Sequence, residues 1–420
     1  MIKLKKSKTK AVICGVCLDH TSKKEKELSI DEMERLANTA GIQITDKIMQ
    51  NRNKIDKTYY AGKGFVAEVV SKVKKGDIII FDNELSPSHA RNIEQDFSID
   101  VVDRTEVILD IFKKHASTNE AKLQVRLAEL NYQLPRLKKL WSHLDRERGG
   151  ASGTGGTSRG MGEKQIEVDK RLVRSEIKKV SKQLEKVDKQ METQRKQRQN
   201  KKKVCLIGYT NAGKSTLFNK LTNAGVLVEN KLFATLNSTA KTLEFEKGRD
   251  IVLSDTVGFI SELPHHLVAS FKATLHDVSD ADLLLHVVDF ADNNFPKYIS
   301  EVNKVLKEID ADNIIQILVL NKIDKIKNYN KFPKLDDEIS TIKISAKNGE
   351  NVDKLLKMIE DNLFDSKEVK LLIPHTEQKA VNKLHNIAKI LQTEYVEKGV
   401  KIKATINRED LFEFEEFVVS

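Results

Sequence analysis

The stretch Gly208-Tyr209-Thr210-Asn211-Ala212-Gly213-Lys214-Ser215 decides the fold of this 420-residue chain. It follows an apolar run over residues 203–207 and precedes a helical pattern over residues 216–222. A glycine-rich turn between a strand and a helix lets backbone N–H groups surround phosphate oxygens, and the helix N-terminus adds a positive partial charge. In such a turn Lys214 would reach the β- and γ-phosphates, and the Ser215 hydroxyl would coordinate Mg²⁺. The stretch therefore predicts a phosphate-binding loop in an α/β domain.

A second motif, Asp255-Thr256-Val257-Gly258, ends a strand pattern over residues 250–254. A carboxylate at that position can hold Mg²⁺ directly or through water. The Gly258 N–H can approach a γ-phosphate because no Cβ interferes. The next residue is Phe259, where a glutamine would orient the attacking water in many such proteins. We therefore expect slow intrinsic hydrolysis that a partner accelerates.

Two further motifs concern the base. Asn321-Lys322-Ile323-Asp324 follows a buried strand pattern over residues 314–320, and its final carboxylate can accept two N–H bonds from guanine. Adenine lacks that donor pair and would leave Asp324 buried and unpaired, which costs roughly 1–3 kcal/mol. Ser345-Ala346-Lys347 follows the next strand pattern, where it can contact the base. The four motifs in this order predict GTP binding.

A threonine-containing segment, Phe233-Ala234-Thr235-Leu236-Asn237-Ser238-Thr239, lies between the phosphate-binding loop and Asp255. One of its threonines should close over Mg²⁺ and the γ-phosphate when GTP is bound. We favour Thr235 over Thr239, although spacing alone does not choose between them.

Two apolar stripes predict a helical hairpin. The first steps by three or four residues from Leu123 to Trp141, and the second has heptad spacing from Ile166 to Met191. Neither helix could bury its stripe alone, so we expect antiparallel packing, with a kink at Pro135. The link over residues 149–162 holds seven glycines, which predicts a mobile tip loop.

The second of these helices carries most of the excess charge. From Lys164 to Lys203 there are fifteen Lys or Arg against six Asp or Glu, while the whole chain has a net charge of +10. A solvated helix face is one interpretation. The other is a basic arm that follows nucleic-acid phosphates, with Arg148 and Arg159 at its tip. Because the excess is gathered on one arm, we favour the second.

Composition excludes several classes of protein. Hydrophobic residues make up 39% of the chain, enough for ordinary cores and too much for a disordered protein. No apolar run approaches the ~18–20 residues of a membrane span, and the basic start Met1–Lys6 lacks the apolar segment of a secretory signal. Three cysteines without an extracellular cue indicate a reduced, cytoplasmic protein, with peripheral membrane association left open. Cys14-Gly15-Val16-Cys17 lies in an apolar strand pattern, so we expect these thiols in a core.

Strand and helix patterns alternate from residue 9 to 104 and from 203 to 362, which predicts two parallel sheets with helices on their faces. The first alternation has candidate strands at residues 11–18, 77–81 and 99–103. The last pattern is a strand at 371–373, a helix over 378–395 and a strand over 400–406. We therefore expect a multidomain α/β fold: an N-terminal α/β domain (1–112), a long antiparallel helical hairpin (113–200), a central Ras-like P-loop GTPase domain (201–366) and a small C-terminal α+β domain (367–420).

These residues, together with motifs outside the phosphate-binding domain, resemble the HflX family of ribosome-associated GTPases over nearly the whole chain. Phe233-Ala234-Thr235-Leu236 matches, whereas Asn237-Ser238 stands where Asp-Pro is usual. The most specific matches are Ala61-Gly62-Lys63-Gly64, Glu84-Leu85-Ser86-Pro87, Arg91-Asn92, Asp103-Arg104-Thr105, Gln124-Val125, Leu134-Pro135-Arg136-Leu137, Gly162-Glu163 and Asp169-Lys170-Arg171.

The resemblance implies a protein that binds the large ribosomal subunit and its rRNA in the GTP form. It implies splitting of stalled or hibernating ribosomes, with the tip loop reaching toward the peptidyl-transferase region. It also raises ATP binding by the N-terminal domain. There Lys63, at a helix start, could touch a phosphate, although we favour a tight packing turn.

The resemblance assigns Thr235 as the Mg²⁺-linked threonine, so Ser215 and Thr235 are the expected metal ligands. Lys214, Thr235 and Gly258 are expected to act in the hydrolysis of GTP. The resemblance adds a short segment to the nucleotide contacts: Phe233, Ala234, Leu236 and Asn237.

Two other function classes fit parts of the chain. One is an RNA-binding or ribosome-assembly factor in which nucleotide only stabilises the fold. The other is a signalling GTPase with protein partners, against which the basic arm argues. We expect a monomer that switches with GTP and Mg²⁺.

Overall fold

The computed structural model describes residues 9–19, 22–74, 76–137, 158–196, 201–225, 232–233, 239–245, 249–260, 277–326, 340–364 and 366–419. Among the helices in these ranges, none combines the length and apolarity that a bilayer span requires. The chain clusters into two compact units, each described here by itself. The first is Met1–Glu192 with Glu229–Asn237 and Ile260–Ala273, and the second is Thr193–Val228, Ser238–Phe259 and Thr274–Ser420.

The first unit contains a parallel four-stranded sheet in the order β2-β1-β3-β4, as the alternating pattern predicts. Helices α2 and α3 pack on one face through buried residues such as Phe65, Val69 and Ile93. The elements are β1 (Lys10–Leu18), α1 (Lys23–Thr39), β2 (Gln43–Arg52), α2 (Lys63–Lys72), β3 (Ile78–Phe81), α3 (Pro87–Phe97) and β4 (Val101–Asp103).

Edge strand β2 was absent from the sequence-based expectation. None of its residues is fully buried, and its sequence QITDKIMQNR is mostly polar. It is held by its parallel pairing along β1. A strand that is stabilised by backbone pairing at a sheet edge carries little apolar periodicity, so the pattern was too weak to detect.

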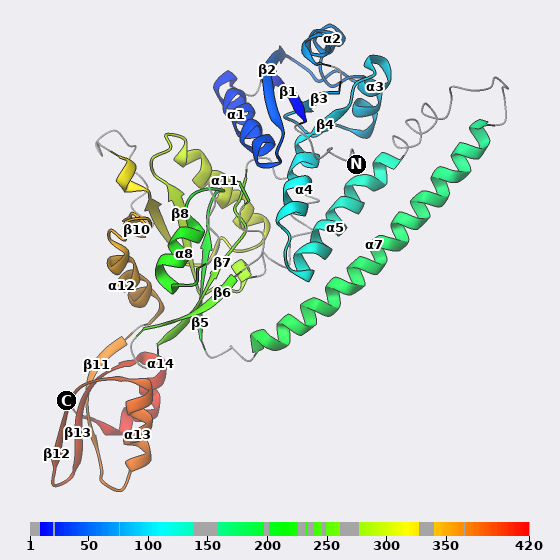
Figure 1. Cartoon of the computed structure of the whole chain (residues 1–420). Coiled ribbons are helices and arrows are strands. Elements are labelled where there is room, and N and C mark those ends of the chain that lie inside the picture. The colour runs from blue at the N-terminus through cyan, green and yellow to red at the C-terminus, as the bar shows by residue number, and fades with distance from the viewer. Residues whose placement is uncertain are drawn as a thin grey trace. The chain divides into compact units, whose positions relative to one another are not determined.

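Long helices follow the sheet in the first unit. They are α4 (Arg104–His115), α5 (Asn119–Gln133), the 3₁₀ turn η1 (Leu134–Arg136) and α7 (Ser158–Lys196). Figure 1 shows α7 running back along α5, and Leu130, Val180 and Leu184 form the buried centre of the contact. The antiparallel hairpin is therefore confirmed. The expected kink is instead a helix end, because α5 stops at Gln133 and the residues around Pro135 form the 3₁₀ turn.

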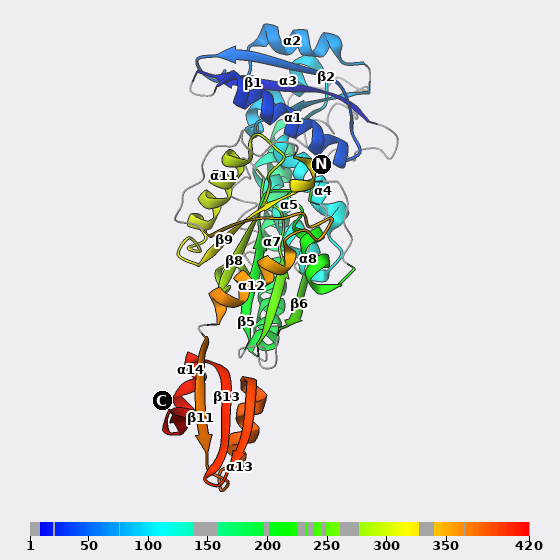
Figure 2. The same ribbon diagram turned by 90° about the vertical axis from the view of Figure 1, so that its left-hand side faces the viewer.

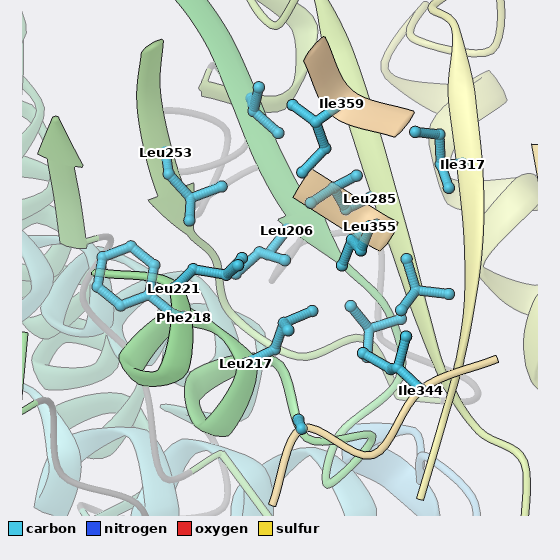
Figure 3. Close-up of a cluster of buried hydrophobic side chains, with 14 of the residues drawn as sticks. Leu206, Leu217, Phe218, Leu221, Leu253, Leu285, Ile317, Ile344, Leu355 and Ile359 are labelled. Atoms are coloured by element: carbon cyan, nitrogen blue, oxygen red, sulfur yellow. The ribbon is translucent and has the colours of Figure 1, made fainter. Parts of the chain in front are cut away.

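The second unit contains a six-stranded sheet in the order β10-β9-β8-β5-β7-β6. It is not parallel throughout as expected, because the edge strand β6 pairs antiparallel with β7. Figure 3 shows the core on one face, where Phe218 and Leu221 of α8 lie near Leu206 and Leu253. Its elements are β5 (Lys202–Ile207), α8 (Lys214–Thr222), β6 (Thr239–Glu244), β7 (Asp250–Asp255), β8 (Leu283–Asp289), α11 (Phe295–Glu308), β9 (Gln316–Asn321), η2 (Ile323–Lys325), β10 (Ser340–Lys343) and α12 (Val352–Leu363).

The end of the chain forms an antiparallel sheet in the order β12-β13-β11-β14, with α13 on one face, as the turned view of Figure 2 also shows. The expected helix over residues 378–395 was too long. Helix α13 ends at Ile387, and strand β12 follows and forms a hairpin with β13. The elements are β11 (Ser366–Ile373), α13 (Gln378–Ile387), β12 (Lys389–Val396), β13 (Gly399–Asn407), α14 (Arg408–Leu411), η4 (Phe412–Phe417) and β14 (Val418–Val419).

The multidomain α/β fold class is confirmed: a parallel-sheet domain with a helical hairpin, a P-loop domain and a small C-terminal sheet domain. The predicted boundaries between these domains stay predictions. Cys14 and Cys17 are buried in β1, as expected for core residues, and Cys205 is buried in β5.

Candidate nucleotide-binding site

The loop between β5 and α8 takes the conformation that its glycines permit. Gly208 has φ +145° and Gly213 has φ +98°, both in the region that side chains disfavour. A Cβ on Gly208 would lie 2.1 Å from the Val287 carbonyl oxygen, and one on Gly213 would lie 2.3 Å from Asn321 Nδ2. The loop is therefore pressed against the ends of neighbouring strands, and only glycine fits at these two positions.

Lys214 begins α8 and points back over the loop. Its Nζ donates to the carbonyl oxygens of Gly208 and Tyr209, both at 3.0 Å. The side chain is only 6% exposed, and burial lowers its pKa to about 8, against the opposing charge of Asp255. Neutral carbonyls solvate an ammonium group less well than water does. An anion that binds at the loop would therefore form strong charge-assisted hydrogen bonds with Lys214.

Ser215 and Asp255 form the polar pair next to Lys214. Ser215 Oγ donates to Asp255 Oδ2 at 2.7 Å, while Oδ1 of the same carboxylate is buried without a hydrogen-bond partner. Burial raises the pKa of Asp255, and the charge of Lys214 opposes this rise. The Ser215 hydroxyl oxygen and Asp255 Oδ1, which accepts no hydrogen bond, are both hard oxygen ligands that suit Mg²⁺.

The fit to Mg²⁺ requires ligands beyond protein side chains. Within the part of the chain that the structure describes, no three His, Cys, Asp or Glu side chains gather into a metal-binding group. Mg²⁺ commonly takes one or two protein oxygens together with phosphate oxygens and water. The pair of Ser215 and Asp255 beside a phosphate-binding loop fits that arrangement.

The segment after β7 lies directly against the loop. The Thr210 N–H donates to the Phe259 carbonyl oxygen at 2.7 Å, and the Phe259 N–H donates to the Gly208 carbonyl oxygen at 3.1 Å. A Cβ on Gly258 would lie 2.9 Å from Thr210 Cα and 3.1 Å from Lys214 Nζ. Gly258 is thus brought next to the buried lysine, where a side chain would interfere. In the same segment, Thr256 Oγ1 donates to the Leu206 carbonyl oxygen at 2.7 Å, and Val257 is half-buried.

The Asn321–Asp324 segment meets the phosphate-binding loop at the carboxyl end of β9. Asn321 Nδ2 donates to the Ala212 carbonyl oxygen at 3.0 Å, and Lys322 Nζ donates to that of Asn211 at 2.7 Å. The Ala346 N–H donates to Asn321 Oδ1 at 2.9 Å. The structure therefore joins three of the predicted motifs through one asparagine and one lysine.

Asp324 differs from the expectation in its exposure. It is an exposed residue, flanked by the buried Ile323, and its Oδ1 accepts a hydrogen bond from Ser345 Oγ at 2.6 Å. Its carboxylate can therefore receive a base from solvent, oriented by Ser345. Ala346 is buried, whereas Lys347 is exposed beside it.

The predicted threonine segment is only partly described. Ala234, Thr235, Leu236 and Asn237 lie outside the described residues, and Thr239 begins β6. Phe233 is buried and clusters with the first unit, where its ring packs edge-on against Phe112 of α4 at 4.7 Å between centroids. The metal-linked role of Thr235 stays a prediction.

Sequence reasoning missed two residues of this region. Asp289, the last residue of β8, accepts a hydrogen bond from Lys322 Nζ at 2.6 Å. Tyr298 of α11 stacks on Tyr209 of the phosphate-binding loop. The rule that ligands lie at the carboxyl ends of parallel strands could have pointed to Asp289. No pattern in the sequence signals the tyrosine pair.

The Gly62-Lys63 turn in the first unit has a packing explanation. The Gly62 N–H donates to Gln50 Oε1 at 2.9 Å, and a Cβ there would lie 2.6 Å from Arg52 Nη1. Lys63 is exposed at the start of α2. These contacts account for the glycine and leave ATP binding by this domain a prediction.

Three families of known proteins match consecutive parts of the chain. They are described as GTP-binding GTPase N-terminal over residues 27–113, GTP-binding GTPase Middle Region over residues 115–198, and 50S ribosome-binding GTPase over residues 203–322.

Curated relatives extend the match to the whole chain. GTPase HflX of Caldanaerobacter subterraneus subsp. tengcongensis is 40% identical over 425 residues, covering 100% of this chain and 96% of the relative. GTPase HflX of Escherichia coli K12 is 39% identical, covering 80% and 79%. A GTP-binding protein from Sulfolobus solfataricus, solved with GDP, is 24% identical with a TM-score of 0.43, covering 84% of this chain and 98% of that one.

Proposed function

The chain belongs to the HflX family of GTPases, and from this we propose that it binds the large ribosomal subunit in its GTP form and splits or rescues stalled ribosomes. It is a guanine-nucleotide-binding GTPase. The proposal rests on one observation. Three groups lie around one phosphate-binding loop: Lys214, the Ser215–Asp255 pair and the Asn321–Asp324 segment. We place this activity in the cytoplasm, with the protein acting as a monomer.

Lys214 binds the β- and γ-phosphates in this proposal. Its buried ammonium group exchanges two carbonyl partners for phosphate oxygens, which strengthens the charge-assisted bonds. Ser215, and Thr235 from the segment before β6, hold Mg²⁺, with Asp255 supporting the ion. The ion supplies neutralisation of the charge that develops on the phosphates. The Gly258 N–H contacts the γ-phosphate, at a residue where an added Cβ would lie 3.1 Å from Lys214 Nζ.

The base is selected by Asp324. Its exposed carboxylate accepts the paired N–H groups of guanine, while Ser345 orients it. Asn321 and Lys322 act on the phosphate-binding loop, because their nitrogens donate to its carbonyl oxygens. Phe259 has no polar group with which to orient water, so the isolated protein hydrolyses GTP slowly and the ribosome accelerates it.

The helical hairpin supplies the contact with ribosomal RNA. Helix α7 exposes a series of basic side chains along its described part: Arg171, Arg174, Lys178, Lys179, Lys182, Lys186 and Lys189. A basic face of this kind follows phosphates and makes binding depend on salt. The glycine-rich tip would extend the arm into the subunit.

The experiment that tests this function is sedimentation with purified large subunits in GTP, GDP and a non-hydrolysable GTP analogue. We expect co-sedimentation with the analogue, weak binding with GDP, and weaker binding as salt rises. Lys214→Ala should abolish both GTP turnover and the nucleotide-dependent binding. Equal binding in GDP and the analogue would instead favour the second candidate, an RNA-binding or assembly factor with structurally bound nucleotide.

A pair of charge variants tests the basic arm. Lys178→Glu with Lys182→Glu reverses two exposed lysines one turn apart on α7. Lys354→Glu with Lys357→Glu does the same on α12, outside the arm. We expect only the first pair to weaken subunit binding and flatten its salt dependence, with GTP binding unchanged in both. Equal losses from the two pairs would mean that net charge, and not the arm, attracts the subunit.

A further inference from the structure

The second residue of the phosphate-binding loop is held by an aromatic stack. The ring of Tyr209 lies against the ring of Tyr298, with 4.2 Å between centroids and 20° between planes. Tyr209 is only 6% exposed. Its carbonyl oxygen is one of the two acceptors that hold Lys214 Nζ. The stack therefore acts on the backbone that positions the phosphate-binding lysine.

Tyr298 also makes a long hydrogen bond to the segment between β8 and α11. It lies in the first turn of α11, and its hydroxyl donates to Asp292 Oδ2 at 3.3 Å. The other oxygen of Asp292 accepts the N–H of Asn294 at 2.9 Å. The tyrosine ring is thus presented to the loop by a short structured turn.

The same segment holds the phosphate-binding loop at a second point. Asp289, at the end of β8, accepts a hydrogen bond from Lys322 Nζ at 2.6 Å, and Lys322 in turn donates to the Asn211 carbonyl oxygen. The loop is therefore supported through Tyr209 by a ring and through Asn211 by an ion pair. Both supports come from side chains within residues 289–298, the ring of Tyr298 and the carboxylate of Asp289.

We propose that Tyr298 is a positioning residue for GTP, holding the phosphate-binding loop in its nucleotide-ready shape through Tyr209. A loop that is already ordered loses less conformational entropy when phosphates bind. The gain in affinity falls mainly on the β-phosphate, which GTP and GDP share, because Lys214 and the loop N–H groups contact it in both nucleotides. The inference concerns nucleotide binding alone and does not depend on the ribosome.

The test measures the affinity of the full-length protein for GDP and for a non-hydrolysable GTP analogue, with a fluorescent nucleotide, in Tyr298→Ala and Tyr298→Phe. We expect Tyr298→Ala to weaken both affinities by the same factor, between about two- and tenfold, the range of an aromatic pair. The KM for GTP should rise by that factor while kcat stays unchanged. Tyr298→Phe keeps the stack and should bind like the wild type.

A matched control separates positioning from general loss of packing. Val302 lies four residues further along α11 and is fully buried. Val302→Ala should lower the Tm and leave both nucleotide affinities unchanged. A Tyr209→Ala and Tyr298→Ala double-mutant cycle should show that the two losses are not additive.

Three results would overturn the proposal. Tyr298→Ala could bind both nucleotides with wild-type affinity. Tyr298→Phe could lose as much affinity as Tyr298→Ala, which would assign the effect to the hydroxyl. Val302→Ala could weaken binding equally, which would assign it to the stability of α11. Each leaves the GTPase assignment intact, because Lys214 and Asp324 are unchanged.

Discussion

Lys214 shows how a single buried charge prepares a binding site. Burial lowers its pKa to about 8. In the nucleotide-free protein the ammonium group of Lys214 therefore loses its proton at a lower pH than that of an exposed lysine. Phosphates favour the charged form and raise the pKa again. Nucleotide binding above pH 8 must therefore take up a proton.

This gives a pH dependence with a defined sign. GDP affinity should be constant below about pH 8 and fall above it, by at most about tenfold per pH unit. Isothermal titration in buffers of different ionisation enthalpy should detect the proton uptake. Lys214→Arg keeps a charge that does not titrate, so its affinity, although weaker, should not follow this profile. The same profile in the arginine variant would exclude Lys214 as the titrating group.

Phe233 shows backbone strain held by a side-chain contact. Its φ of +56° is unfavourable for an aromatic residue, and it persists because the buried ring packs against Phe112. Replacing the ring should destabilise the protein by about 3–5 kcal/mol in Phe233→Ala. Phe233→Gly should lose about 1 kcal/mol less, because glycine accepts this φ.

Thermal denaturation tests this ranking. The control position is Phe81 in β3, which is also buried but is not among the residues with positive φ. There alanine should be more stable than glycine. If glycine is also the worse replacement at position 233, no strain is stored in that backbone.

At the scale of elements, Asp103 joins β4, α4 and the end of α5. Its Oδ1 accepts the Glu106 N–H at 2.9 Å and the Tyr132 hydroxyl at 2.9 Å. Its Oδ2 accepts the Leu85 N–H at 3.1 Å and Arg136 Nη2 at 3.2 Å. The motifs around residues 85, 103 and 136, which are far apart in sequence, therefore share one buried carboxylate.

Removing this carboxylate should loosen the base of the hairpin. Asp103→Ala leaves Arg136 without a buried counter-ion and should cost about 3–5 kcal/mol. Asp96→Ala also removes an acceptor of a tyrosine hydroxyl, that of Tyr59, but from an exposed position. It should cost less than about 1 kcal/mol. Urea denaturation of both variants measures the difference in the free energy of unfolding. Equal losses would show that the buried Asp103 carboxylate stabilises the fold no more than the exposed Asp96 does.

At the scale of the whole molecule, the glycine-rich tip should matter for the ribosome and not for the nucleotide. Residues 155 and 156 lie outside the described ranges, so this expectation rests on the sequence. Gly155→Pro and Gly156→Pro should leave GTP turnover of the isolated protein unchanged and reduce ribosome splitting several-fold, because proline stiffens the loop. Gly155→Ala, which adds little rigidity, is the control. Normal splitting by both proline variants would mean that the tip does not act on the subunit.

Sequence by itself determined the phosphate-binding loop, the motifs that the structure brings to it, the parallel core of both α/β sheets and the paired long helices. These follow from local rules: glycines permit the turn, apolar periodicity defines a buried face, and the carboxyl ends of parallel strands gather at one edge. Those rules need only neighbouring residues, so they can be applied without the fold.

Only the tertiary structure decided the edge strand β2, the switch from α13 to β12, and the support of the loop by Tyr298. Each of these depends on a partner distant in sequence: β1 for β2, β13 for β12, and Tyr209 of the loop for Tyr298. Backbone pairing and ring stacking place almost no constraint on nearby residues. No local sequence pattern therefore indicates these contacts, and they can be recognised only in the folded chain.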